Sequence, residues 1–134
     1  MENCIFCKII NKEIPSFKIY EDEYTYAFLD IAKDVDGHIL VVPKKHVTNV
    51  LDVDNETLAH VMDTVKLISN HLVNNCGYEG VNILNASGKA AQQTVFHLHI
   101  HIIPRKSEDG VNAWPNFTGA KNELEVMHNL LKVK

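Results

Sequence analysis

The motif His-Leu-His-Ile-His-Ile-Ile, which begins at His97, alternates histidine strictly with aliphatic residues. Successive side chains of a β-strand point to opposite faces of a sheet, so the motif predicts a strand with His97, His99 and His101 on one face. A single histidine in such a strand is usually a surface residue, whereas three in alternation are rarely chance. We expect a strand over residues 95–103, ended by Pro104, that packs one face on a core and presents a row of imidazoles on the other.

The rest of the chain combines helical and strand patterns. Apolar residues at helical spacing predict helices over residues 4–11, 55–76 and 122–132, with Asp54 as N-cap and Gly77 as the stop of the long helix. Short runs bounded by turn residues predict further strands over residues 17–21, 24–30, 38–42 and 80–85. Since the order lacks strict βαβ alternation, we expect an α+β fold: an antiparallel sheet of about five strands, one long helix and short terminal helices.

Composition limits the class of protein. The 134 residues, 46% of them hydrophobic, suit a single domain over 1–134, with 105–134 as a C-terminal loop and helix extension. A formal charge of −4 argues against non-specific binding to nucleic acid or to an anionic membrane. No apolar run approaches the roughly 18 residues of a membrane helix. Three cysteines and no visible secretory signal predict reduced thiols and a cytoplasmic protein.

The spacing of the three histidines limits their joint use. Positions i and i+4 of a strand lie roughly 13 Å apart, whereas zinc–nitrogen bonds are about 2.0–2.1 Å long. One ion could take two neighbouring histidines but hardly all three, so at least one needs a second role. An imidazole near neutral pH can serve as a nucleophile, a proton shuttle or a donor to phosphate.

Two other groups carry potential chemistry. Cys4 and Cys7 form a CxxC pair that, by itself, fits zinc binding, redox chemistry or chance, because no zinc-finger closing pair follows. The polar turn over residues 85–94 leads into the histidine motif, and its backbone N–H groups with Gln93 and Thr94 could bind an anion. Most such turns only connect strands, but beside three histidines this one is a candidate phosphate site.

Several separate motifs together resemble the histidine triad (HIT) family, in its nucleotide-binding branch. Besides the triad itself and the preceding Gln-Thr-Val-Phe, they are CIFCKII from Cys4, FLDI from Phe28, GHILVVPKKH from Gly37 and the Trp-Pro pair at Trp114. The motifs stand in the expected order and cover nearly the whole chain. Within the branch, the chain is most similar to the small zinc-containing bacterial hydrolases.

The resemblance implies a catalytic role for each of three histidines. His99 would attack an α-phosphate and form a nucleotidyl-histidine intermediate, which water would then hydrolyse. An imidazole with an ordinary pKa near 6.5 is mostly neutral at neutral pH, as this attack requires. His101 would face the phosphate oxygens, and His38 would lie behind the triad and position it.

The resemblance also implies nucleotide-binding roles beyond the triad. The implied apolar slot for the base consists of Phe6, Ile9 and Phe28. Asp30 would accept hydrogen bonds from the ribose hydroxyls. The phosphate or the leaving group would contact Asn85, Gln93 and Thr94, together with His99 and His101. Without the resemblance, the apolar residues would be taken for core and Asp30 for a solvated turn residue.

For the CxxC pair, the resemblance implies one structural zinc ion per chain. Its ligands would be Cys4, Cys7, His46 and His97, a closed tetrahedral set. One triad histidine would then bind metal and leave His99 and His101 for phosphate. The alternative is a pair of free thiols on a short helix.

The sequence departs from the family pattern at the polar turn. Gln92 stands where the family usually has glycine before the glutamine, which makes a left-handed backbone less favourable there. The family's asparagine eleven positions before the first histidine is replaced by Ala86, with Asn85 adjacent. We therefore expect one contact from this turn to the nucleotide to be shifted or lost.

These observations predict a hydrolase of the histidine triad type that cleaves an AMP or GMP conjugate, of the phosphoramidate class, at its α-phosphate. One alternative is a dinucleoside polyphosphate hydrolase that uses the same residues. Another is a zinc-stabilised, nucleotide-binding regulatory protein whose turnover is incidental. The resemblance further implies a homodimer, with Trp114 near the partner subunit or the rim of the active site.

Overall fold

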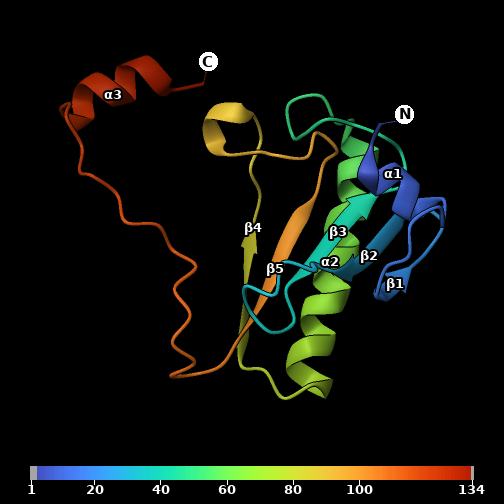
Figure 1. The fold of residues 1–134 in the computed structure, drawn as a ribbon. Helices are drawn as coiled ribbons and strands as arrows, with labels where there is room; N and C mark the ends of the chain where they lie inside the picture. Colours follow the sequence, from blue (N-terminus) through green and yellow to red (C-terminus); the bar gives the residue numbers. More distant parts are fainter. Residues whose placement is uncertain (1–2, 134) are drawn as a thin grey trace.

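The computed structural model describes residues 3–133, and a five-stranded sheet forms its centre (Figure 1). Its elements are α1 (Ile5–Ile10), β1 (Lys18–Glu21), β2 (Thr25–Leu29), β3 (Ile39–Pro43), α2 (Asn55–Asn75), β4 (Gly80–Leu84), the 3₁₀ turn η1 (Lys89–Ala91), β5 (Ile100–Arg105) and α3 (Leu124–Leu131). The predicted α+β fold, with one long helix and short terminal helices, is confirmed.

All neighbouring strands are antiparallel, in the order β1-β2-β3-β5-β4. β3 lies at the centre, and all five of its residues are buried. Its side chains serve two cores in alternation: Ile39 and Val41 pack in the cluster that includes α2, and Leu40 and Val42 in the cluster that includes α1. The short apolar run of β3 therefore belongs to a strand covered on both faces.

Helix α2 crosses one face of the sheet and has the ends that the sequence predicts. The Asp54 carboxylate accepts the backbone N–H of Thr57, which satisfies one free amide of the first turn. At the other end, Gly77 takes a left-handed conformation with φ +83°. The buried stripe between them is made by Val61, Thr64, Val65, Ile68 and Leu72.

The strand of the histidine motif begins later than predicted. β5 starts at Ile100, not at Val95, because the N–H of Leu98 donates to a carbonyl outside the sheet, before the strand begins. Pro104 lies inside β5 and does not end it. Pairing with β3 stops at Ile102, so the missing N–H of the proline falls where β3 no longer pairs.

After β5 the chain leaves the body of the protein as an arm, residues 106–133, that ends in α3 (Figure 1). Arg105 holds the start of the arm against the sheet. Its Nε and Nη2 each donate to the Asp109 carboxylate at 2.9 Å, and its Nη1 donates to Oδ1 of Asn82, in β4, at 2.7 Å. No residue of α3 is buried. No helix within residues 3–133 is long and apolar enough to cross a membrane.

Candidate active site and metal centre

The alternation of the histidine motif survives the late start of β5. Leu98, Ile100 and Ile102 all join the core on the α2 side of the sheet. His97 and His99 lie on the opposite side, where both rings meet the ring of Phe6 edge-on, at centroid distances of 5.9 and 5.1 Å. The prediction of a row of imidazoles on one side of the sheet is therefore confirmed, although only its last member belongs to β5.

A backbone contact fixes the tautomer of His99. Its Nδ1 lies 2.8 Å from the carbonyl oxygen of His97, and a carbonyl can only accept a hydrogen bond. Nδ1 therefore carries the proton and Nε2 keeps its lone pair when the ring is neutral. Burial lowers the pKa of His99, which favours this neutral form.

His101 is held by a chain of side chains. Its Nδ1 lies 2.8 Å from Nε2 of His38, and Nδ1 of His38 lies 2.9 Å from Oδ1 of Asp34. Burial, with lesser contributions from the His99 and His38 charges, lowers the pKa of His101 to about 4. His101 is therefore neutral at pH 7. The expected place of His38, behind the triad, agrees with this geometry.

The predicted apolar slot lies against the same side of the sheet. Phe6, Ile9 and Phe28 are buried in the core cluster shared with α1, and the Phe6 and Phe28 rings pack edge-on at 5.6 Å. Asp30 follows β2 directly. Its Oδ1 accepts the backbone N–H of Ala32, and its Oδ2 lies 3.8 Å from Nδ1 of His38, beyond hydrogen-bond distance.

The polar turn differs from a simple anion cradle. The Gln93 side chain is buried, and its hydrogen-bonding capacity is used within the chain: Nε2 donates to the carbonyls of Thr48 and Val95, and Oε1 accepts from Asn49 and from the Gly88 N–H. The buried Gln93 side chain therefore stabilises the conformation of the turn and is not free to bind a phosphate. The amides of residues 91–93 are also taken, by carbonyls of the same turn, which leaves them no hydrogen for a phosphate.

Two further predicted residues of this turn are placed differently. Thr94 is exposed, which leaves its hydroxyl accessible to a ligand. The Asn85 side chain donates to the carbonyl of His99 at 3.0 Å and so holds the chain between the turn and β5. Asn49, which the sequence analysis did not identify, lies in the loop before α2, and its side-chain amide donates to Oε1 of Gln93. No local motif could have singled it out.

Gln92 adopts the left-handed conformation, with φ 73° and ψ 26°, although it is not glycine. The expectation that glutamine disfavours this geometry gives the wrong backbone here, because the hydrogen bonds of the surrounding turn impose it. A non-glycine residue in this region costs roughly 1 kcal/mol or more. We predict that Gln92→Gly raises the free energy of unfolding by about 0.5–1 kcal/mol relative to Gln92→Ala. Urea denaturation of both variants measures this, and equal stabilities would contradict it.

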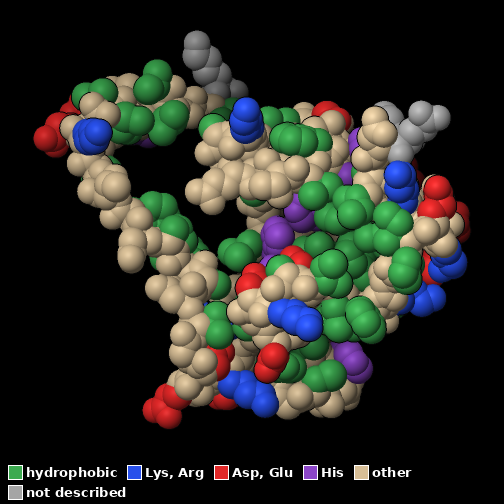
Figure 2. Space-filling view, in the orientation of Figure 1, with side chains coloured by type: hydrophobic (Ala, Val, Ile, Leu, Met, Phe, Trp, Pro, Cys, Tyr) green, Lys and Arg blue, Asp and Glu red, His purple; other side chains and the backbone are tan. Residues whose placement is uncertain are grey.

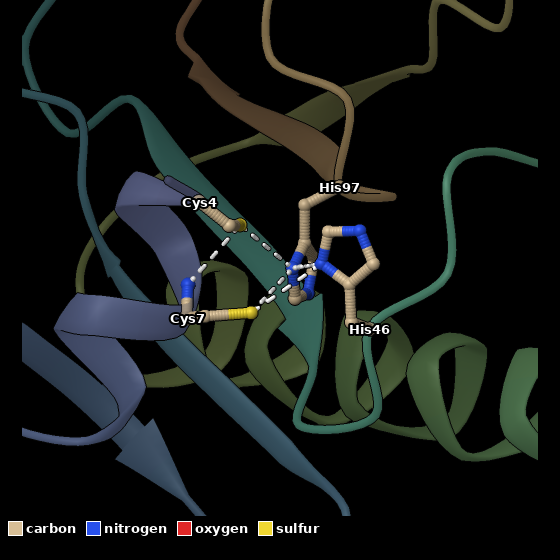
Figure 3. A group of neighbouring side chains, drawn as sticks. All are labelled: Cys4, Cys7, His46 and His97. Carbon is tan, nitrogen blue, oxygen red and sulfur yellow. Dashed lines mark hydrogen bonds between the residues drawn. The ribbon is translucent and has the colours of Figure 1, made fainter. Parts of the chain in front are cut away.

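The four residues predicted to bind zinc converge on one point (Figure 3). Nδ1 of His97 lies 3.3 Å from Sγ of Cys4, 3.6 Å from Sγ of Cys7 and 3.1 Å from Nδ1 of His46. Sγ of Cys7 also lies 3.3 Å from Nδ1 of His46. Tetrahedral zinc with nitrogen and sulfur ligands places its donor atoms about 3.3–3.8 Å apart. The donor set therefore fits zinc in both type and spacing.

The proton positions around this cluster support the same fit. Nε2 of His97 lies 2.8 Å from the carbonyl of Pro43, so the proton of the neutral ring is on Nε2 and the Nδ1 lone pair faces the cluster. Burial, and then the neighbouring Cys4, raise the pKa of the Cys7 thiol to about 11. A bound cation would favour the thiolate that zinc requires.

A second group of potential ligands, Asp30, His38 and His101, also lies within metal-binding reach. The facing ring nitrogens of its two histidines are joined by a hydrogen bond, and the other nitrogen of His38 is bound to Asp34. These nitrogens are satisfied without an ion, and the group is better described as a hydrogen-bonded relay.

Two of the histidines, His38 and His101, open onto a hollow of about 630 Å³ between the sheet and the arm (Figure 2). His38 and His101 line it from the sheet, Asn85 and Gln92 from the polar turn, and residues 110–113 from the arm. Residues 110–113 of the arm thus form one wall of the hollow beside His101. The resemblance had placed the neighbouring Trp114 near the partner subunit or the rim of the active site.

Comparison with known proteins agrees with this geometry. The model of the HIT domain family matches residues 11–108. The chain belongs to the HIT family. Adenosine 5'-monophosphoramidase HNT1 of Saccharomyces cerevisiae is 39% identical over 133 residues, which cover 98% of this chain and 82% of that protein. The identified family includes hydrolases, and the prediction of an enzyme is confirmed at that level.

Solved structures of family members show the same fold. The crystal structure of SMU.412c from Streptococcus mutans superposes with a TM-score of 0.85 at 38% identity, covering 97% of this chain and 82% of that one. A zinc-bound histidine triad family protein from Mycobacterium smegmatis superposes with a TM-score of 0.79 at 36% identity, covering 86% of this chain and 84% of that one. The family that the motifs resemble is therefore the family of this chain.

Proposed function

We propose that this HIT protein is a purine nucleotide-binding nucleotidyl hydrolase that cleaves an AMP conjugate of the phosphoramidate class at its α-phosphate. The observation that carries the proposal is the hydrogen bond from Nδ1 of His99 to the carbonyl of His97. It leaves a neutral imidazole whose Nε2 lone pair is available for attack on phosphorus. The phosphoramidase activity named for the yeast relative supports the substrate class.

The reaction would proceed in two displacements. In the first, Nε2 of His99 forms a bond to the α-phosphorus, and the bond to the leaving amine breaks with its electron pair on nitrogen, which takes up a proton. In the second, water attacks the phosphorus, the phosphorus–nitrogen bond to His99 breaks, and the nucleoside monophosphate is released. Two easier steps replace one difficult step, which is the usual gain of covalent catalysis.

Other residues would bind and orient the substrate. His101 would lie beside the α-phosphate at the end of the relay through His38, where the lone pair on its Nε2 could accept a hydrogen bond from the attacking water. Asp30 would accept from the ribose hydroxyls through its Oδ2, since Oδ1 already accepts the Ala32 N–H. The base would lie against the apolar slot of Phe6, Ile9 and Phe28. Thr94, whose side chain is exposed, would donate to the phosphate or the leaving group, while Gln93 and Asn85 would shape the turn.

We propose one structural zinc ion per chain, held by Cys4, Cys7, His46 and His97. When bound, the ion would supply a cross-link between α1, the loop after β3 and the segment before β5. This cross-link would fix His97, whose carbonyl in turn orients His99. Zinc would therefore act on the geometry of the nucleophile without contacting the substrate.

A homodimer in the cytosol is the assembly that we propose. Apolar side chains of the arm face solvent in the single chain, among them Trp114, Phe117, Leu124 and Leu130. An isolated eight-residue helix such as α3 is marginal in water, so a contact with a second copy would stabilise it. Reduced Cys4, Cys7 and Cys76 suit a reducing compartment. Sedimentation at equilibrium measures the assembly state.

A substrate panel tests the reaction class. Release of AMP from an adenosine phosphoramidate is compared with release from a dinucleoside polyphosphate at equal concentrations. We expect kcat/KM for the phosphoramidate to be at least about tenfold higher, a difference of about 1.4 kcal/mol in transition-state stabilisation. Faster cleavage of the dinucleoside polyphosphate would replace the proposed substrate class. Tight binding of AMP with no turnover of either compound would leave only nucleotide binding.

A further inference from the structure

We propose that Asp34 is a positioning residue of the active site, which fixes the tautomer of His38 and, through it, the orientation of His101. The inference rests on the proposed function in so far as His101 faces the reacting phosphate. Nothing in the sequence motifs assigns a role to Asp34, which stands in the loop between β2 and β3 and belongs to none of them.

The proton positions follow from the chemistry of the atoms in contact. An ionised carboxylate only accepts hydrogen bonds, so the 2.9 Å contact with Oδ1 of Asp34 places a proton on Nδ1 of His38. With that proton on Nδ1, the other nitrogen of the uncharged ring, Nε2, keeps a lone pair and accepts from Nδ1 of His101, 2.8 Å away. Nε2 of His101 is left with a lone pair, which can accept a hydrogen bond from water or from another donor in the site. The Asp34 carboxylate thus fixes the tautomer of His38 directly and that of His101 through His38.

Two carboxylates lie near His38, and geometry separates their roles. Oδ2 of Asp30 is 3.8 Å from Nδ1 of His38, too far for a hydrogen bond, whereas Oδ1 of Asp34 is 2.9 Å away. A carboxylate engaged with two ribose hydroxyls could not also hold the imidazole well. Asp34 would therefore leave Asp30 free for the nucleotide.

The loop is folded so that Asp34 turns back onto His38. Lys33 takes a left-handed conformation with φ 56°, and Gly37 has φ 78°. A Cβ atom at Gly37 would lie 3.1 Å from Cγ of Pro104, so glycine also allows the loop to approach β5 closely. The His38 imidazole is buried, whereas more than half of the Asp34 side chain is exposed. The hydrogen bond thus connects the buried His38 ring to a carboxylate at the protein surface.

The test uses Asp34→Ala, with Asp34→Asn as the conservative variant and Asp36→Ala as the matched control in the same loop. Long-range ¹H–¹⁵N correlation spectra report which nitrogen of His38 is protonated. We expect Nδ1 to carry the proton in the wild type, in Asp34→Asn, whose amide oxygen can still accept, and in Asp36→Ala. In Asp34→Ala we expect the Nδ1 proton to be lost or shared with Nε2.

Turnover of an adenosine phosphoramidate gives the functional readout. Asp34→Ala should lower kcat about tenfold with KM changed by less than about twofold, because Asp34 acts through His38 and does not bind the nucleotide. Asp34→Asn should recover most of kcat. An unchanged His38 tautomer in Asp34→Ala would overturn the proposal. So would a changed tautomer in Asp34→Ala if the kcat of that variant equalled the kcat of the control Asp36→Ala. If the wild type lacked turnover, the proposed function would fall, but the tautomer would still decide the role of Asp34.

Discussion

Replacing His99 with alanine is expected to lower the hydrolysis of an adenosine phosphoramidate by a factor of about 10³ or more, the range seen when an enzyme loses its covalent nucleophile. The reason is specific to this site. His99 alone among the triad combines a tautomer fixed by a backbone carbonyl with an Nε2 that makes no hydrogen bond within residues 3–133. Release of AMP, followed directly under steady-state conditions, measures the effect.

A matched control and a rescue separate chemistry from folding. His71→Ala removes an exposed imidazole on α2 and should leave turnover unchanged within about twofold. His99→Gly opens a space of imidazole size, and added imidazole should restore part of the activity by supplying the missing nucleophile. Retention of more than a tenth of the activity in His99→Ala would show that another group attacks the phosphate.

The second large effect concerns the metal centre. We expect about one zinc ion per purified chain, and loss of zinc together with a fall in Tm of about 8–15 °C in Cys4→Ser. A structural zinc ion that binds only the folded chain contributes several kcal/mol, and about 1 kcal/mol corresponds to roughly 2–5 °C in a domain of this size. Metal content by mass spectrometry and thermal unfolding followed by circular dichroism test the two parts.

Cys76→Ser is the natural control for this experiment. Cys76 is an exposed thiol at the end of α2 and lies outside the metal cluster. Its replacement should change neither the zinc content nor Tm by more than about 2 °C. Zinc-free wild-type protein with an unaltered Tm, purified without chelators, would remove the structural ion from the proposal. It would leave the cluster as free thiols beside two imidazoles.

Local patterns were sufficient to predict most of the fold. The period of 3.6 in α2, its Asp54 cap and its Gly77 stop depend on interactions within a few residues, and such interactions are visible in the chain order. The period of 2 around His99 is equally local and placed the imidazoles on one side of the sheet. The end of that strand was missed because Pro104 is tolerated only through the register of β3, a long-range property.

The types of residue and their spacing also predicted part of the candidate site. Alternation and the CxxC pair showed that His97, His99 and Cys4 were special, but spacing left open whether zinc, phosphate or neither was bound. The resemblance to the HIT family supplied those roles. The fold then brought together Cys7 and His46, which are 39 residues apart in the sequence, at 3.3 Å.

Only the tertiary structure showed which of several chemically similar residues makes which contact. Two aspartates of one loop look alike in the sequence, yet Asp34 reaches His38 at 2.9 Å and Asp30 does not. Gln93 has the chemistry of a phosphate donor, yet its amide is already saturated by partners as distant in sequence as Asn49. Gln92 is left-handed although its own side chain disfavours it. For Gln93 the deciding partners, Asn49 and Thr48, lie in a separate segment of the chain, so the contact depends on how the fold assembles the two. The Asp34–His38 contact and the backbone of Gln92 form within one loop and one turn. Their geometry follows from the path of that loop and that turn, which the residue types alone do not determine.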